Sequence, residues 1–188
     1  PTAYYLILFA AYNRLPAQEA QPLNYTWALT LTLLSIIILK QKITARDIIS
    51  GLICYSGVWI IATRGAVFSL QFADPIGVML ALGSTILWAL YWVLNKKDSR
   101  EPVVALFQNF IVGTSLVLAW CLLTGESMKI EIVGLAGTAY IGLFEMGFTF
   151  VLWMMAIKRS DNSSRVGNLI FLSPPISLIL IATVLGEQ

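Results

Sequence analysis

Glu145 is the residue of this sequence that points most directly to chemistry. It is the only charged residue in the apolar stretch 132–157, and it lies near the middle of that stretch. A carboxylate at the centre of a bilayer costs roughly 2.5–3.5 kcal/mol, so it is tolerated where it faces a cavity or where burial keeps it protonated. Either state could bind a ligand amine or carry a proton. The alternative is a protonated glutamate that only donates a hydrogen bond to a neighbouring helix. Thr149 follows four residues later, on the same helical face.

A second group of residues combines aromatic rings with polar atoms. Ser84, Trp88, Tyr91 and Asn95 follow one another at helical spacing and form one stripe. Such a stripe suits the wall of a cavity for a partly apolar ligand, with Trp88 and Tyr91 as its candidate binding residues. An aromatic belt at a membrane interface, or plain helix packing, would give the same pattern.

Polar residues in two other apolar stretches are further candidates for binding. Asn24, Tyr25 and Trp27 lie in the first long stretch, and Asn168 lies in the last. Buried amides and hydroxyls also join helices, at about 0.6 kcal/mol each on average, so a structural role is the alternative for each of them.

Pro174 and Pro175 interrupt the last apolar stretch. Each proline removes a backbone donor and clashes one turn back, so the carbonyl groups of Ile170 and Phe171 lose their helical partners. A membrane helix tolerates such a break where it lines a cavity or packs on neighbours that satisfy the backbone. The pair therefore predicts either a hinge or a static kink.

The composition shows which solvent these residues meet. The chain has 188 residues, of which 58% are hydrophobic and 12% charged, with a mean hydropathy of +0.80. Soluble domains carry about 25% charged residues, so lipid must be part of the solvent. Histidine is absent, and the two cysteines lie in separate apolar runs, which predicts neither a metal site nor a disulfide framework. A net charge of +2 gives no sign of nucleic-acid binding, and no cofactor is expected.

Runs of about 17–25 apolar residues predict the membrane spans. Six such runs are present, at 23–39 (beginning nearer Ala17), 48–63, 76–95, 103–123, 132–157 and 166–185. The shorter run 1–12 is interpreted as the second half of a helix, and we expect the chain to be a fragment of a longer protein at both ends. Thr44 and Asp47 have the spacing of a capping box, and Asp74-Pro75 predicts a helix start.

The basic residues predict the orientation of these spans. Nine of the twelve lie in the alternate connections 40–47, 96–102 and 158–165, and the opposite connections hold three. Because cytoplasmic loops carry the excess of lysine and arginine, we expect these three loops to face the cytoplasm. The prediction is a multi-pass protein of the plasma membrane, the inner membrane in a bacterium.

A weak internal repeat relates the two ends of the chain. A shift of 145 residues places 2–14 over 147–159, and one further residue places 28–41 over 174–187. Asn24 and Asn168 then fall near each other, as one pseudo-symmetric pair. Five spans separate the copies, so they must have opposite orientations. Inverted repeats are typical of secondary transporters, whose binding site lies between the repeats near the midplane.

Three stretches, in this order and spacing, resemble the EamA branch of the drug/metabolite transporter superfamily. They are 22–35, 77–97 with its Gly83–Tyr91 segment, and 168–174 with the closing 185–187. The resemblance implies ten helices in two five-helix repeats, with this chain running from the middle of helix three to the end of helix nine. Residues 1–68 would then belong to the first repeat and 69–188 to the second. Ala28 stands where the family has a proline, so we expect the first repeat to be less kinked than the second.

The predicted fold is therefore an all-α integral membrane protein, a polytopic helix bundle with an inverted 5+5 repeat. The resemblance implies a permease that exports small metabolites, amino acids or related compounds, by alternating access. Proton coupling is a hypothesis that rests on Glu145. The alternatives are an integral membrane enzyme acting on lipid-linked substrates and a non-transporting membrane scaffold. The expected partners are a small-molecule substrate and the lipid bilayer, and the oligomeric state is open, a homodimer included.

Overall fold

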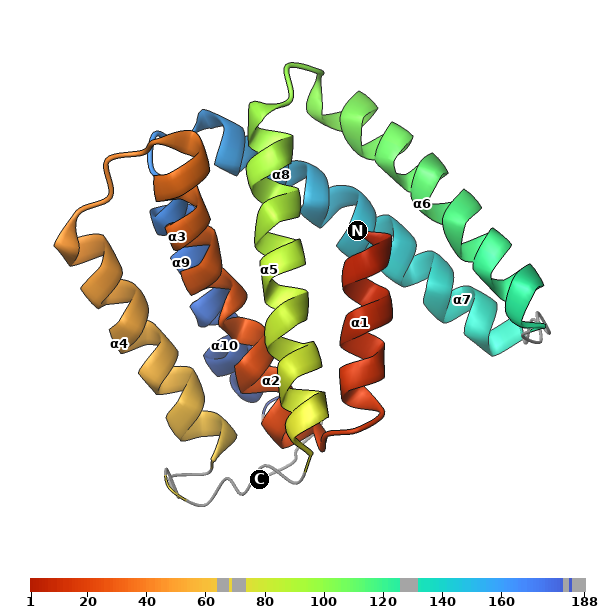
Figure 1. Ribbon diagram of the computed structural model, residues 1–188, viewed down its shortest axis with the longest axis horizontal. Helices are drawn as coiled ribbons and strands as arrows, with labels where there is room; N and C mark the ends of the chain where they lie inside the picture. Colours follow the sequence, from red (N-terminus) through yellow and green to blue (C-terminus); the bar gives the residue numbers. More distant parts are fainter. Residues whose placement is uncertain (64–67, 69–73, 126–131, 181–182, 184–188) are drawn as a thin grey trace. The chain divides into compact units, whose positions relative to one another are not determined.

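The computed structural model of the chain describes residues 1–63, 68, 74–125, 132–180 and 183, and these residues form helices and no strand (Figure 1). The helices are α1 (Thr2–Tyr12), α2 (Ala17–Tyr25), α3 (Trp27–Leu39), α4 (Ala45–Ala62), α5 (Pro75–Lys97), α6 (Pro102–Thr124), α7 (Ile132–Tyr140), η1 (Ile141–Thr149), α8 (Phe150–Arg159), α9 (Ser163–Asn168), η2 (Leu169–Leu172) and α10 (Ser173–Leu180). Within the described part, four segments are long and apolar enough to cross a membrane, namely Glu19–Leu39, Pro75–Lys97, Pro102–Thr124 and Ile132–Arg159. These findings confirm the predicted all-helical, polytopic membrane bundle.

Helices α4 and α5 begin at capping side chains that the sequence predicts. Asp74 Oδ1 accepts hydrogen bonds from the backbone N–H groups of Ile76, at 2.8 Å, and Gly77, at 3.2 Å, so α5 starts as predicted. At α4 the predicted capping box is present. The Thr44 N–H donates to Asp47 Oδ2 at 3.0 Å, and the Asp47 N–H donates to Thr44 Oγ1 at 3.4 Å.

The first long span is interrupted for one residue, at Thr26, between α2 and α3. The Thr26 hydroxyl donates to the carbonyl oxygen of Leu23 at 2.6 Å, and its backbone N–H reaches the same oxygen at 3.2 Å. Pro22 lies inside α2, where it has no N–H to give the helix. The predicted first repeat therefore has a break of its own, although Ala28 stands where the resembled family has a proline.

The span predicted at 132–157 is one helical segment with a change of helix type in the middle. Residues Ile141–Thr149 form a π-helix between α7 and α8. The Thr149 hydroxyl donates to the carbonyl oxygen of Phe144, five residues earlier, at 2.9 Å. A Cβ added at Gly147 would lie 3.2 Å from the carbonyl oxygen of Gly142. The absence of a side chain at Gly147 thus leaves room for the Gly142 carbonyl group in the wider turn of the π-helix.

The last span differs most from its prediction. It begins at Ser163 rather than at Val166, because Asn162 Oδ1 caps α9 by accepting from the N–H groups of Ser164 and Arg165, at 3.0 and 3.3 Å. A 3₁₀ turn, η2, then separates α9 from α10. The predicted end, 181–185, lies almost wholly outside the described residues, as does the closing motif 185–187.

The chain divides into two compact units, which are described separately. One contains residues 1–2 and 94–160, and the other contains 3–93 and 161–188. This division follows packing and differs from the repeat boundary at 68/69, which stays a prediction.

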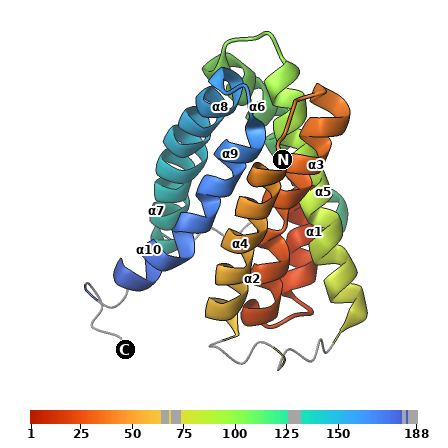
Figure 2. The same ribbon diagram turned by 90° about the vertical axis from the view of Figure 1, so that its left-hand side faces the viewer.

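In the unit formed by 3–93 and 161–188, α9 packs against α3 and α4, and α4 also packs against α2. Figure 1 shows α9 behind α3, and Figure 2 shows it beside α4. Helices α9 and α3 approach closely at Gly167, where an added Cβ would lie 3.2 Å from Leu31 Cδ2 and 3.7 Å from the Ala28 carbonyl oxygen. Small residues at such crossings let the backbones of membrane helices approach closely.

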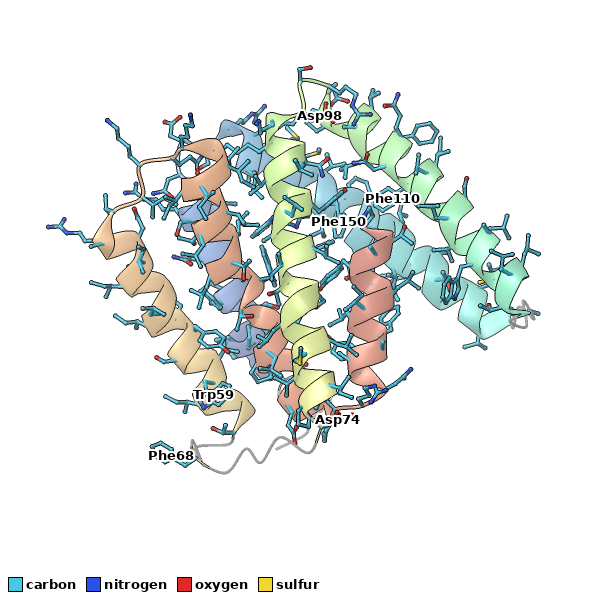
Figure 3. All side chains as sticks on the ribbon, viewed as in Figure 1. Trp59, Phe68, Asp74, Asp98, Phe110 and Phe150 are labelled. Atoms are coloured by element: carbon cyan, nitrogen blue, oxygen red, sulfur yellow. The ribbon has the colours of Figure 1, made fainter. Side chains whose placement is uncertain are left out.

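In the unit formed by 1–2 and 94–160, α6 packs against α8. The rings of Phe110 and Phe150 meet at this contact, with centroids 6.1 Å apart (Figure 3). Asn109 Nδ2 donates to Asn95 Oδ1 at 3.1 Å and fastens α6 to the last turns of α5. The outward sides of α6 and α7 expose large apolar side chains, among them Leu123 and Ile132, as expected for helices solvated by lipid.

Candidate functional site

The unit formed by 3–93 and 161–188 holds a cluster of aromatic side chains from α1 and α5. We define the aromatic cluster as Tyr4, Tyr5, Trp88, Tyr91 and Trp92. Trp88 is its hub. The Tyr4 ring stacks on it with centroids 4.3 Å apart and an interplanar angle of 23°, and Tyr91 stacks at 5.6 Å and 19°. Tyr5 and Trp92 meet it edge to face, at 5.9 and 5.4 Å. The predicted stripe on α5 thus faces a second aromatic layer.

Asn24 joins this cluster through Tyr4. The Tyr4 hydroxyl donates to Asn24 Oδ1 at 3.1 Å. The structure therefore brings together three of the predicted residues, Asn24, Trp88 and Tyr91, and the connecting residue is one that sequence reasoning missed. Its signal was the tyrosine pair in the short apolar run 1–12, since tyrosine offers a flat ring and a polar hydroxyl in one side chain.

Tyr25 belongs to a second aromatic group, with Tyr55 of α4 and Phe171 of η2. The Phe171 ring centroid lies 6.4 Å from that of Tyr25 and 6.2 Å from that of Tyr55. The Tyr55 hydroxyl donates to the Pro22 carbonyl oxygen at 3.1 Å. Because Thr26 bonds to Leu23, the Pro22 carbonyl is released by the break in the helix, and Tyr55 supplies its donor.

Asn168 has different neighbours from Asn24. Its Nδ2 donates to the Asp47 carbonyl oxygen at 3.3 Å, and its Oδ1 lies 3.0 Å from the position of a Cβ added at Gly51. The two amides, which the repeat places near each other in the alignment, do not meet in this structure. Asn24 faces α1, whereas Asn168 faces the first turns of α4.

The remaining candidates lie apart from the aromatic cluster. Trp27 is buried in the first turn of α3. Glu145 and Thr149 belong to the other compact unit, where both side chains are exposed on the π-helix Ile141–Thr149. Short π-helical segments are frequent at functional sites, so the position is compatible with the predicted role.

Pro174 and Pro175 lie in the first turn of α10, immediately after the 3₁₀ turn. Proline is well tolerated in the first turn of a helix, where the missing N–H would have no partner. The Ser173 N–H bonds to the Ile170 carbonyl oxygen in the shorter 3₁₀ pattern. The prolines therefore stand at the joint between α9 and α10 rather than inside a regular helix.

Comparisons with known proteins agree with this architecture. The model of the EamA-like transporter family matches residues 1–63 and 75–188. The chain is 25% identical over 183 residues to a protein of Ancylobacter novellus named aromatic amino acid exporter YddG, covering 95% of this chain and 62% of that protein. It is 24% identical over 194 residues to a protein of Streptantibioticus cattleyicolor named "Probable terminal-alkyne amino-acid exporter", covering 99% and 62%. A solved crystal structure has the same fold, with a TM-score of 0.81 at 22% identity, over 96% of this chain and 63% of that one. The chain thus spans less than two thirds of the length of these proteins.

Proposed function

Because the chain belongs to the EamA-like transporter family, we propose that the protein is a secondary transporter that exports small metabolites. The observation that carries the proposal is the aromatic cluster with Asn24, which gathers ring faces and an amide from three apolar segments of one compact unit. Aromatic walls with a few convergent polar groups are the usual make-up of a small-molecule site. The family and the relatives named as transporters favour this function over a membrane enzyme or a scaffold.

We propose amino acids or related compounds as the substrate class. The two relatives named above carry the words amino acid and exporter in their names. A site formed from the aromatic cluster would suit an apolar or aromatic side chain, and the Asn24 amide suits a carboxylate or an ammonium group.

The two broken helices support an alternating-access cycle. The repeat alignment that places Ala28 over Pro174 also places Thr26 over Leu172, the last residue of the 3₁₀ turn. The two predicted counterparts are thus interrupted at matching positions. Interrupted helices of this kind are where inverted-repeat transporters form their site and move around it. Pro174 and Pro175 are the proposed hinge, and loops 40–47, 96–102 and 158–165 are proposed to face the cytoplasm.

Proton coupling through Glu145 is a separate part of the proposal. Its support is a lone carboxylate in the apolar segment Ile132–Arg159, on a π-helical stretch. A carboxyl group that changes its protonation during the cycle would link efflux to the proton gradient. Thr149, one turn away, is the proposed second polar group on this path.

The test uses the full-length protein in proteoliposomes loaded with labelled amino acids, amines and sugars. Trp88→Ala should reduce efflux of the transported class at least about tenfold, since it removes the ring on which the cluster is built. Trp120→Ala is the matched control, because Trp120 is exposed on α6 and should leave efflux unchanged. Equal efflux in both variants would refute the assignment of the site. No efflux of any compound from the parent protein would refute the transporter proposal.

A further inference from the structure

Asp47 is a buried charged group that the proposed transport site does not use. Its side chain is 8% exposed, at the first turn of α4. Oδ1 accepts from Arg165 Nε at 2.9 Å. Oδ2 accepts from the Thr44 backbone N–H at 3.0 Å, from Thr44 Oγ1 at 2.8 Å and from Asn162 Nδ2 at 2.8 Å. The carboxylate is thus fully satisfied, and its partners come from two different parts of the chain.

Half of the hydrogen bonds to Asp47 come from a residue close in sequence, and half come from the start of α9. Thr44 belongs to the same loop as Asp47 and supplies two of the bonds. Asn162 and Arg165 belong to the start of α9, more than a hundred residues later, and supply the other two. If α9 moves away, Asp47 therefore keeps half of its hydrogen bonds.

The two charged side chains of this contact differ in their exposure to solvent. The Arg165 side chain is 70% exposed, so on separation its guanidinium group returns to water with little change in hydration. A pair in which both charges are buried would leave an uncompensated charge on opening, at a high cost. Here only the carboxylate is buried, and opening leaves it with the two hydrogen bonds from Thr44.

Two further polar contacts lie next to Asp47, beside the apolar packing of Gly167 on Leu31. The Ser163 N–H donates to Gln41 Oε1 at 3.0 Å, and Thr32 Oγ1 donates to Ser164 Oγ at 2.9 Å. A pocket of about 210 Å³ lies beside Asp47, between α3 and α4. The C-terminal end of α9 leads into the 3₁₀ turn η2, a helix type that often marks a hinge. The six-residue α9 therefore lies between a polar contact and a joint.

We propose that Asp47, with Arg165 and Asn162, forms a latch that opens and closes once in each transport cycle. In its closed form the latch fastens α9 to α4 and so shuts the end of the protein at which loop 40–47 lies. In its open form α9 moves about η2, and the Thr44 bonds hold Asp47 ready for closure. The inference rests on the proposed function, because a latch needs a cycle in which it opens.

The first experiment measures opening without measuring transport. A reporter Ser164→Cys is placed in the full-length protein with Cys54 and Cys121 replaced by serine, and its reaction with a membrane-impermeant maleimide is followed. Ser164 is 1% exposed, so labelling requires opening. Arg165→Glu should raise the labelling rate about fivefold, the scale expected for loss of one partly exposed ion pair, and Arg165→Lys should restore most of the parent rate.

Arg46→Glu is the matched control. Arg46 is exposed on the same loop, next to Asp47, and the substitution makes the same change of charge. Its labelling rate should equal that of the parent. Labelling of Arg165→Glu at the parent rate, or an equal rise in Arg46→Glu, would overturn the latch.

The second experiment fixes α9 to α3, beside the latch, so that α9 cannot move about η2. Thr32→Cys with Ser164→Cys places two thiols where two hydroxyl oxygens lie 2.9 Å apart, so the sulfur atoms would be neighbours that an oxidant should join. Oxidation should arrest efflux, a reductant should restore it, and each single cysteine variant should be insensitive to the oxidant. Cross-linked protein that exports at the parent rate would overturn the latch. Absence of efflux from the reduced parent would refute the proposed function instead, and the labelling comparison would still decide whether the latch opens.

Discussion

Gly51→Ala gives a sharp test of the packing between α4 and α9. In a helix interior, glycine is about 1 kcal/mol less favourable than alanine, so the substitution alone should stabilise α4. A Cβ at this position would, however, lie 3.0 Å from Asn168 Oδ1 and 3.3 Å from Leu29 Cδ2. The amide must then shift by a few tenths of an ångström, which weakens its bond to the Asp47 carbonyl oxygen. That bond is worth about 0.6–1.7 kcal/mol between membrane helices, and relief of the overlap adds about 1 kcal/mol more.

Gly57→Ala is the control on the same helix, because a Cβ at Gly57 would meet no atom within 4 Å. It should raise the free energy of unfolding by about 1 kcal/mol, whereas Gly51→Ala should leave it unchanged or lower it by up to about 1.7 kcal/mol. Thermal unfolding in detergent, followed by tryptophan fluorescence, should separate the two variants by several degrees. In an Asn168→Ala background, Gly51→Ala should regain most of its stabilising effect. Equal shifts of the two glycine variants would refute the reasoning.

Three further predictions concern single groups. Tyr55→Phe should lower the unfolding free energy by about 0.6–1.7 kcal/mol in detergent, because the Pro22 carbonyl loses its donor. The Asp47 carboxyl group accepts several hydrogen bonds, of which the one from Arg165 has the largest effect. These bonds hold the pKa of Asp47 well below the usual value. Ionised Asp47 therefore stabilises the folded protein above about pH 4, and this stabilisation is lost as the pH falls further. Arg165→Gln should make the decrease in unfolding temperature at acid pH smaller. Glu145→Gln should abolish the pH dependence of efflux in proteoliposomes, and unchanged pH dependence would exclude proton coupling through this residue.

The apolar runs predicted the helices well where local chemistry also marks their ends. The start predicted at Asp74-Pro75 is correct because capping and a first-turn proline are local features. The predicted last span begins three residues after the start of α9. The apolar run begins at Val166, whereas the cap at Asn162 starts the helix at Ser163. The π-helix at 141–149 could not be predicted, because it depends on a close backbone approach between Gly142 and Gly147 rather than on hydropathy.

The candidate site shows the same limit. The stripe of Trp88 and Tyr91 was visible because both residues lie on one helix with a fixed period. Their partner Tyr4 was not, since which side chain covers the stripe is decided by the packing of α1 on α5. The two amides show the converse. Asn24 and Asn168 were paired by the repeat alignment, but tertiary contacts give them unrelated partners.

The latch was hidden because each of its parts already had a local explanation. Asp47 was assigned to a capping box and Arg165 to the excess of basic residues that orients the chain, and both assignments concern neighbours in sequence. The two roles of Arg165 can be separated experimentally. Eight of the nine basic residues in the predicted cytoplasmic loops remain in Arg165→Glu, against three in the opposite connections, so the predicted orientation should survive. Faster labelling of Ser164→Cys in that variant would therefore report an opened contact and not an inverted protein.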